Sequence, residues 1–247
     1  MKFVGITVCV NYAPILRLAL QETSQRLDRI IVVTKKDDID TIKVCEGYNN
    51  VDTVFFDFSV DERWFETHMK RFKNGEMNNP PDMRKQYWSK RLSDANVKGF
   101  NKGGGLRLGQ QHVVKNYPGS VQIILDCDIV LPPEFKTATT SMDYINDVLY
   151  VPNERRDYTS YTLYKQQKTF KNYSTAGWGY FQMYRPSIES NRVFYDDWPD
   201  AAKTDVWFRN DILKGDFKKK IKLNTHVDHL GQEGGSIHLT KYNFDFN

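Results

Sequence analysis

The chain has 247 residues, of which 40% are apolar, and this is enough to bury one substantial core in a single α/β domain. The formal net charge of +4 comes from 35 basic and 31 acidic residues, with both signs spread along the chain. This charge suits a protein that handles anionic phosphates, but it falls short of the basic stripe of a nucleic-acid-binding protein. We therefore expect no nucleic-acid partner.

The cysteines and the first residues indicate the compartment. Cys9, Cys45 and Cys127 lie far apart and have no Cys-x-x-Cys spacing, so we expect free thiols in a reducing environment. The apolar run at residues 3–10 is too short for the hydrophobic region of a signal peptide, and no other stretch is long enough to span a membrane. The sequence predicts a cytoplasmic protein without an integral membrane segment.

Short β-branched runs alternate with longer segments of helical period. The pattern predicts strands at residues 3–10, 29–34, 51–58 and 121–125, with helices in the segments 15–27, 39–45 and 92–116. Strands joined by helix-length connections favour right-handed crossovers and a mostly parallel sheet. In such a sheet ligands bind beyond the carboxyl ends of the strands. After residue 133 the pattern is irregular and rich in aromatic residues.

An acidic pair follows the last of these strands. Asp126 and Asp128 stand one residue apart at its end, and two prolines follow. Strand alternation would send both carboxylates to the same side, where they can hold a hard divalent cation that also binds phosphate oxygens. Magnesium or manganese suits such ligands. The alternative is that the two aspartates only end the strand, one as a turn former and the other as a helix cap.

A glycine-rich segment precedes the same strand. Its three glycines, Gly103, Gly104 and Gly105, let the backbone approach a ligand closely, and a helix that begins here would present its amides to an anion. Lys102 adds a mobile positive charge. The segment lacks the spacing of a Walker A loop, and most glycine runs before helices are plain loops. Its position just before the acidic pair is what makes it informative.

In this combination the chain resembles the family 2-like GT-A glycosyltransferases, which have an Asp-x-Asp motif. In that family a segment such as Asn-Lys-Gly-Gly-Ala-Leu-Asn-Leu-Gly precedes the Asp-x-Asp strand, and residues 101–109 and 125–128 are similar in order and spacing. The resemblance covers nearly the whole chain. It implies a GT-A type α/β/α sandwich with a mostly parallel central sheet, as one domain over residues 1–247. Residues 1–131 would be the nucleotide-binding half and residues 132–247 the acceptor-side half.

The same resemblance implies where the nucleotide binds. The turn after the first strand and the end of the second strand would surround the nucleoside. Family members often place an acidic residue directly after the second strand, but here Asp37 and Asp38 come only after two lysines. The predicted nucleotide-binding residues are Asn11, Tyr12, Thr34, Lys35, Lys102, Gly103 and Asp126.

Residues 174–181 resemble the glycine and aromatic segment that shapes the donor-sugar and acceptor pocket in these enzymes. Gly177, Trp178 and Gly179 are the predicted pocket residues, because an aromatic face such as that of Trp178 can stack on a sugar ring. The alternative is that Trp178, Tyr180 and Phe181 belong to a core strand.

Asp205 is the predicted catalytic base. Residues 203–211 resemble the helix start whose aspartate serves as base in inverting members, with Thr204 in place of a glutamate. An acceptor hydroxyl must lose its proton as it attacks the anomeric carbon, and a carboxylate within reach can take it. The alternative is that Asp205 only caps a helix, and Asp196 and Asp197 remain rival bases.

A late histidine completes the predicted metal shell. Residues 224–231 resemble the segment that supplies this ligand in several GT-A enzymes, with His229 as the preferred ligand and His226 as the second choice. Neutral imidazole can join two carboxylates on manganese, whereas a lone histidine is more often a surface residue or a satisfied core residue. The predicted metal ligands are therefore Asp126, Asp128 and His229, for Mn²⁺ or Mg²⁺.

The resemblance implies a metal-dependent glycosyltransferase of carbohydrate biosynthesis. Its partners would be a nucleotide-sugar donor, with UDP as the expected nucleotide, and a saccharide or other acceptor with a free hydroxyl; inversion at the anomeric carbon is expected. One alternative is a sugar nucleotidyltransferase, whose glycine-rich loop normally follows the first strand, where this chain has residues 11–14 instead. The other is a non-catalytic module that binds a carbohydrate or nucleotide.

Overall fold

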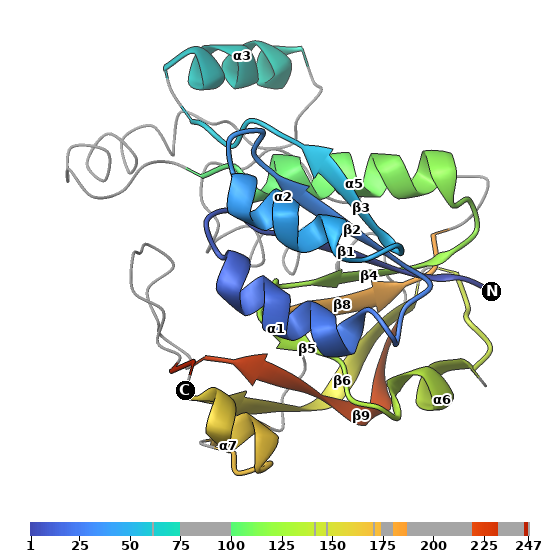
Figure 1. Ribbon diagram of the computed structural model, residues 1–247. Coiled ribbons are helices and arrows are strands. Elements are labelled where there is room, and N and C mark those ends of the chain that lie inside the picture. Colours follow the sequence, from blue (N-terminus) through green and yellow to red (C-terminus); the bar gives the residue numbers. More distant parts are fainter. Residues whose placement is uncertain are drawn as a thin grey trace.

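The computed structural model describes residues 1–60, 62–74, 100–140, 142–146, 148–169, 171–173, 180–186, 219–231 and 245–246. Within them the strands form one nine-stranded sheet with helices on both faces (Figure 1). The strands are β1 (Phe3–Val8), β2 (Arg29–Thr34), β3 (Val51–Phe55), β4 (Val121–Leu125), β5 (Ile129–Val130), β6 (Val148–Tyr158), β7 (Lys171–Tyr173), β8 (Phe181–Tyr184) and β9 (Lys219–Leu230). The helices are α1 (Ala13–Thr23), α2 (Ile39–Glu46), α3 (Glu62–Lys73), α5 (Lys102–Asn116), α6 (Phe135–Thr140) and α7 (Tyr161–Lys165).

The first half of the sheet is parallel. Strands β3, β2, β1 and β4 lie side by side in that order, and Ile6 in β1 is the partner of Ile31 in β2 and of Ile124 in β4. The connections through α1 and α2 are the helix-length crossovers that such pairing requires. Beyond β4 the order continues β8, β6, β9, β5, and this half of the sheet is mixed.

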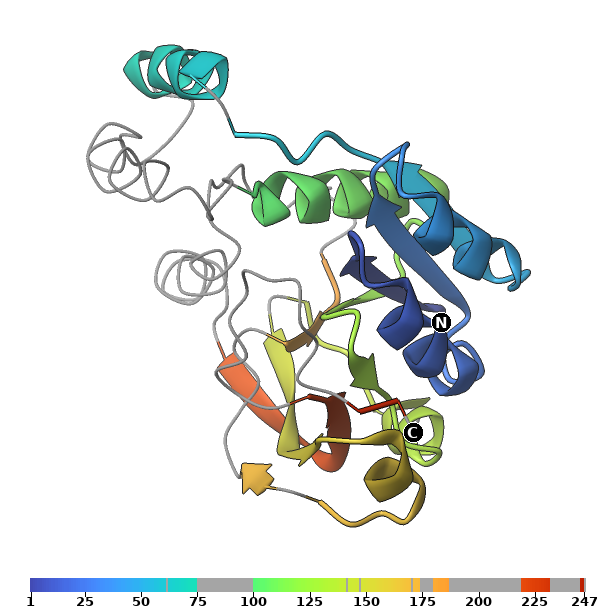
Figure 2. The same ribbon diagram turned by 60° about the vertical axis from the view of Figure 1, so that its left-hand side comes forward.

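Side chains alternate between two cores, one on each face of the sheet. Phe3 packs with Leu16 and Leu20 of α1, whereas its neighbour Val4 packs with Leu106 of α5. Helices α1 and α2 therefore cover one face and α5 covers the other, as both views show (Figures 1 and 2). The predicted α/β fold class, an α/β/α sandwich, is confirmed.

Two glycines of helix α5 leave no room for a side chain. A Cβ added at Gly109 would lie 2.6 Å from Cγ2 of Ile6, and one added at Gly105 would lie 2.5 Å from Cε1 of Phe58. Real Cβ atoms do not approach other atoms so closely, so a larger residue at either position would force the neighbouring side chain or the helix to shift. The helix that begins in the glycine-rich segment thus packs through its glycines. The sequence predicts that this segment presents its amides to an anion, but the amides of Gly104 and Gly105 already donate to Asn101.

The limits of the strands and helices agree only in part with those predicted from the sequence. Strands β2 and β4 have the predicted limits, whereas β1 stops at Val8 and β3 at Phe55, two and three residues before their predicted ends. Asn11 lies in the left-handed region with φ of 60°, and Pro14 falls in the first turn of α1, which begins at Ala13. The predicted helix at residues 92–116 begins only at Lys102: Phe100 forms a bridge with Ser59 and Asn101 is the N-cap, while residues 92–99 lie outside the described part.

The C-terminal half contains two long strands that the sequence did not predict. β9 lies between β6 and β5; it runs parallel to β6, with Tyr158 opposite Leu230, and antiparallel to β5.

Helix α3 stands apart from the sheet in both views (Figures 1 and 2). Among the described residues, no helix is both long enough and apolar enough to cross a membrane.

Candidate functional site

The acidic pair lies in a tight turn between β4 and β5. The amide of Asp126 donates to the carbonyl of Tyr180 (3.0 Å), and the amide of Ile129 donates back to the carbonyl of Asp126 (3.1 Å). Strand β4 ends at Leu125, so strand alternation, on which the sequence argument relied, does not set the direction of the two carboxylates. The turn places both at the carboxyl end of the parallel strands, where ligands bind in such sheets.

A lysine from the glycine-rich segment holds the first aspartate. Lys102 Nζ lies 2.7 Å from Oδ1 of Asp126, and Lys102 is the first residue of α5. Asn101 caps this helix, because its Oδ1 accepts a hydrogen bond from the amide of Gly104 (2.8 Å). The structure therefore brings together Lys102, Gly103 and Asp126, as the sequence predicts, at a helix N-terminus that favours anions.

A histidine from β9 holds the second aspartate. His229 Nε2 lies 3.4 Å from Oδ2 of Asp128, and its Nδ1 lies 3.1 Å from Oδ1 of Asp157. Burial alone would lower the pKa of His229, but the carboxylates of Asp128 and Asp157 outweigh it and raise the pKa to about 10. Burial acts to raise the pKa of Asp128, yet the positive charges of His229 and Lys102 hold it below its ordinary value. Without a bound cation, the site therefore pairs an imidazolium with a carboxylate.

The other histidine of this segment has different neighbours. His226 Nδ1 lies 3.3 Å from Oε1 of Glu134, and its Nε2 lies 3.6 Å from Oδ1 of Asp228. Side chains alternate along a strand, so His226 and His229 leave β9 on opposite faces. Only His229 reaches the acidic pair.

Tyr12 lies beside the acidic turn. Its ring packs against the same core as Cys127, and burial together with the nearby Cys127 and Asp128 raises the pKa of its hydroxyl. The hydroxyl therefore stays protonated at neutral pH and is able to donate a hydrogen bond.

Cys9, Cys45 and Cys127 are free thiols, as predicted.

Asp38 connects the ends of β1 and β2, and the sequence argument missed this role. Its Oδ2 accepts hydrogen bonds from the amide of Asn11 (2.7 Å) and from the hydroxyl of Thr34 (3.1 Å), while Oδ1 accepts from the amide of Thr41 (3.2 Å). Thr34 is fully buried, and Lys35 beside it is half-buried. The signal was present, because an aspartate directly before a predicted helix is a typical N-cap.

The donor chemistry at the acidic turn fits a divalent cation. Asp126, Asp128 and His229 offer oxygen and nitrogen ligands, and Oδ1 of Asp128 is buried without a hydrogen-bond partner in the described part of the chain. Among the described residues, no three acidic, histidine or cysteine side chains already converge on one point. Lys102 occupies one side of Asp126 instead.

The remaining predicted residues lie outside the described part of the chain. They are the pocket residues Gly177, Trp178 and Gly179, the base Asp205, and its rivals Asp196 and Asp197.

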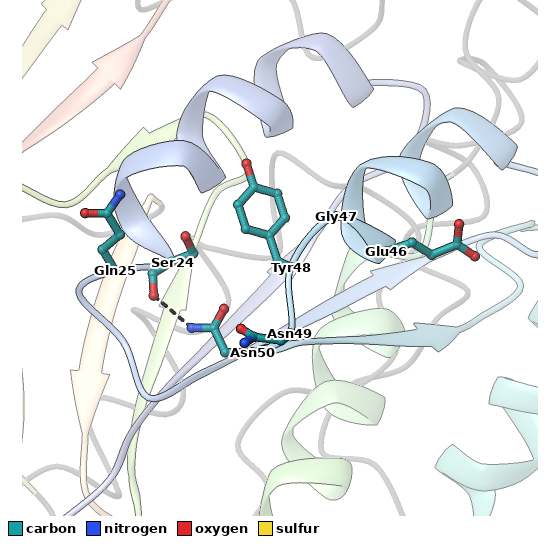
Figure 3. A pocket seen from close by; sticks show the side chains of 7 residues that line it. All are labelled: Ser24, Gln25, Glu46, Gly47, Tyr48, Asn49 and Asn50. Carbon is teal, nitrogen blue, oxygen red and sulfur yellow. Dashed lines mark hydrogen bonds between the residues drawn. The ribbon is translucent and has the colours of Figure 1, made fainter.

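A separate hollow of about 620 Å³ lies between the ends of α1 and α2 (Figure 3). Asn50 immediately precedes β3, so the hollow is at the edge where the parallel strands begin, opposite the acidic turn. It is therefore not part of the candidate site. The hollow is lined by Ser24, Gln25, Glu46, Gly47, Tyr48, Asn49 and Asn50.

No protein-family model matches the chain, and no curated protein sequence matches it. It is similar in structure to HddC from Yersinia pseudotuberculosis, with 14% identity, 93% of this chain and 94% of that chain covered, and a TM-score of 0.43. It is also similar to 4-diphosphocytidyl-2C-methyl-D-erythritol synthase from Anaerococcus prevotii (14% identity, 90% and 87% covered, TM-score 0.39). A third similar structure is a glycosyltransferase involved in glycosylation of the major capsid of PBCV-1 (9% identity, 96% and 95% covered, TM-score 0.39). Similarities at this level do not assign an activity.

Proposed function

We propose that this protein is a metal-dependent glycosyltransferase that moves a sugar from a nucleotide-sugar donor, with UDP as the expected nucleotide, to an acceptor hydroxyl. One observation carries the proposal. Lys102, the turn from Asp126 to Asp128, and His229 come from three separate segments, yet their side chains meet at the carboxyl end of the parallel strands. This is where α/β sheets bind nucleotides.

In this proposal the first turn of α5 binds the donor diphosphate. The helix N-terminus offers a partial positive charge, and Lys102 adds a full positive charge beside it. Tyr12 offers its protonated hydroxyl from the end of β1, where the nucleoside would lie. These groups bind and orient an anionic donor next to the acidic pair.

Asp126, Asp128 and His229 would hold the divalent cation. A bound cation supplies charge neutralisation for a departing diphosphate. Magnesium is usually held by one or two carboxylates together with phosphate oxygens of the substrate. A cation that arrives with the donor is therefore compatible with a site in which three protein ligands do not yet converge.

Proton removal from the acceptor is assigned to Asp205, on the resemblance alone. An inverting transfer needs a base on the acceptor side, and a carboxylate suits this role. The acceptor class proposed is a saccharide or another molecule with a free hydroxyl.

The test measures ligand-dependent melting temperature and turnover together. Nucleoside diphosphates and nucleotide sugars are screened with Mn²⁺ and with EDTA, using the wild type, Asp128→Ala, and Asp143→Ala as a matched control at an exposed aspartate. A ligand present at 100 times its Kd stabilises the native state by about 2.7 kcal/mol. We expect stabilisation by one nucleoside diphosphate only with Mn²⁺, its loss in Asp128→Ala, and its retention in the control.

Three other outcomes contradict the proposal. Release of pyrophosphate from a nucleoside triphosphate and a sugar phosphate would identify a nucleotidyltransferase. Donor binding with neither transfer nor hydrolysis would identify a binding module. Equal metal-dependent stabilisation of the wild type and Asp128→Ala would remove the aspartate from the metal site.

A further inference from the structure

A buried carboxylate stands behind the histidine of the site. Asp157 in β6 is the register partner of His229 in β9, and its side chain is only 1% exposed. Its Oδ1 lies 3.1 Å from Nδ1 of His229, while Nε2 of the same ring faces Asp128 at 3.4 Å. A carboxylate that accepts from one ring nitrogen fixes the orientation of the ring and the direction of the other nitrogen.

An arginine in turn holds this carboxylate. Nε of Arg155 lies 2.9 Å from Oδ1 of Asp157, and a terminal nitrogen of its guanidinium donates to Oδ2 at 3.2 Å. The guanidinium lies over the ring of Tyr180, 4.7 Å from its centroid. The carbonyl of Tyr180 accepts a hydrogen bond from the amide of Asp126. A continuous series of contacts thus joins the two aspartates of the acidic turn. It runs from Asp126 through Tyr180, Arg155, Asp157 and His229 to Asp128.

Stability does not by itself account for this arrangement. Taking an ion pair out of water costs about as much as the attraction between its charges returns, so apolar residues of similar size are often as stable. A buried carboxylate that contacts both an arginine and an imidazole does, however, restrict the imidazole to one orientation.

We propose that Asp157 is a positioning residue: it holds His229 with Nε2 directed at the acidic pair, and Arg155 holds Asp157 in place for that task. The inference rests on the proposed function, in which His229 helps to bind the divalent cation. It adds two residues to the site that lie in a strand without any recognisable motif.

The primary test is the affinity of the full chain for Mn²⁺ in the presence of UDP, measured by calorimetry and by the electron paramagnetic resonance of free Mn²⁺. Loss of a carboxylate behind a ligating histidine typically weakens metal binding 10- to 100-fold. We expect a loss of about that size in Asp157→Asn. In a His229→Ala background the same substitution should have no further effect, because the ring that it positions is absent.

A control variant separates this effect from the general loss of an acid that is paired with an arginine. Asp52 is also paired with an arginine, with its Oδ1 2.6 Å from a terminal nitrogen of Arg29, but it lies in β3, away from the acidic turn. Asp52→Asn should leave Mn²⁺ affinity unchanged. If Asp157→Asn fails to fold, because Arg155 keeps a buried charge without a partner, Arg155→Met/Asp157→Asn removes both charges and should show the same loss.

A measurement without metal completes the design. In ¹⁵N-labelled wild-type protein, the Nδ1 proton of His229 should be observable and slow to exchange with water, and this signal should disappear in Asp157→Asn. If the wild type binds no Mn²⁺ with any nucleotide, the proposed metal function fails, and the inference fails with it. If the wild type binds Mn²⁺ and His229→Ala weakens that binding, but Asp157→Asn does not, only the positioning role is overturned.

Discussion

Lys102 Nζ and Asp126 Oδ1 are 2.7 Å apart, in an ion pair that joins the first residue of α5 to the end of β4. Both side chains are partly exposed, at 15% for the lysine and 33% for the aspartate. The pair therefore lies at an accessible surface, at the point where the N-terminus of α5 already attracts anions. An arriving diphosphate would meet the lysine and the positive end of the helix dipole together.

Lys102→Met should weaken binding of a nucleoside diphosphate by roughly 10- to 100-fold. A hydrogen bond to a charged group contributes about 1.5–3 kcal/mol, and each 1.4 kcal/mol is a factor of ten. Calorimetric titration with UDP checks the prediction. Lys115→Met is the matched control, because Lys115 is exposed in the last turn of the same helix and should bind UDP as the wild type does. Equal affinities in the two variants would contradict the phosphate role of Lys102.

Asp38→Ala should lower the free energy of unfolding by about 1–3 kcal/mol. The substitution leaves the amide of Asn11, the hydroxyl of Thr34 and the amide of Thr41 without their acceptor. Urea unfolding at pH 7 measures the loss. Asp37→Ala changes an exposed aspartate one residue earlier and should stay within about 0.5 kcal/mol of the wild type. A similar small effect at both positions would show that Asp38 does not secure the ends of β1 and β2.

Gly109→Ala should destabilise the fold by about 1–3 kcal/mol, because its new Cβ would meet Ile6 at 2.6 Å. Helix α5 can only accommodate the methyl group by moving away from β1. Chemical unfolding of the single variants and of Gly109→Ala/Ile6→Ala forms a double-mutant cycle. Trimming Ile6 makes room, so the double variant should be more stable than the sum of the single losses. Simple additivity would show that the contact does not limit the packing of α5.

The contribution of Asp52 to stability should depend on pH. Burial acts to raise the pKa of Asp52, but hydrogen bonds from Arg29 and Tyr117 and the charge of Arg29 together lower it below its ordinary value. A carboxyl group whose pKa is lowered by folding stabilises the native state above its unfolded pKa of about 4, and this stabilisation is lost as the pH falls through the folded value. Asp52→Asn should therefore cost about 1 kcal/mol at pH 7, a modest value because the pair is partly exposed. In urea unfolding at a series of pH values, the difference from the wild type should shrink below about pH 4; a constant difference would contradict this.

The first half of the fold could be predicted because its elements carry local signals. The strand limits 29–34 and 121–125 follow from uninterrupted β-branched runs, and the meeting of Lys102 with Asp126 follows from the rule that ligand groups gather at the carboxyl ends of parallel strands. The direction of the two aspartates was argued from strand alternation, but a turn replaces the strand there.

The second half could not be predicted in the same way. Strand β6 begins with an apolar run at residues 148–151, but a proline follows and residues 154–157 are four charged residues in succession, so its second half shows neither an apolar run nor an alternating pattern. Both of its faces carry polar contacts: Arg155 and Asp157 face the site, whereas Arg156 lies against Glu154 and His226. The role of Asp157 depends on its register with β9, which is far away in the chain and has no local signal.

The place of β9 in the sheet has a consequence for how the protein is made. It is inserted between β5 and β6, strands that precede it in the chain by a long interval. During synthesis the parallel strands β1 to β4 and the ion pair between Lys102 and Asp126 can form early, while the gap for β9 is still open. Asp128 can pair with His229 only after the whole of β9, which ends at Leu230, has been synthesised. Leu223 and Val227 of the same strand also belong to the core that contains Phe3 and Leu16. Neither this core nor the site can be complete before β9 has entered the sheet.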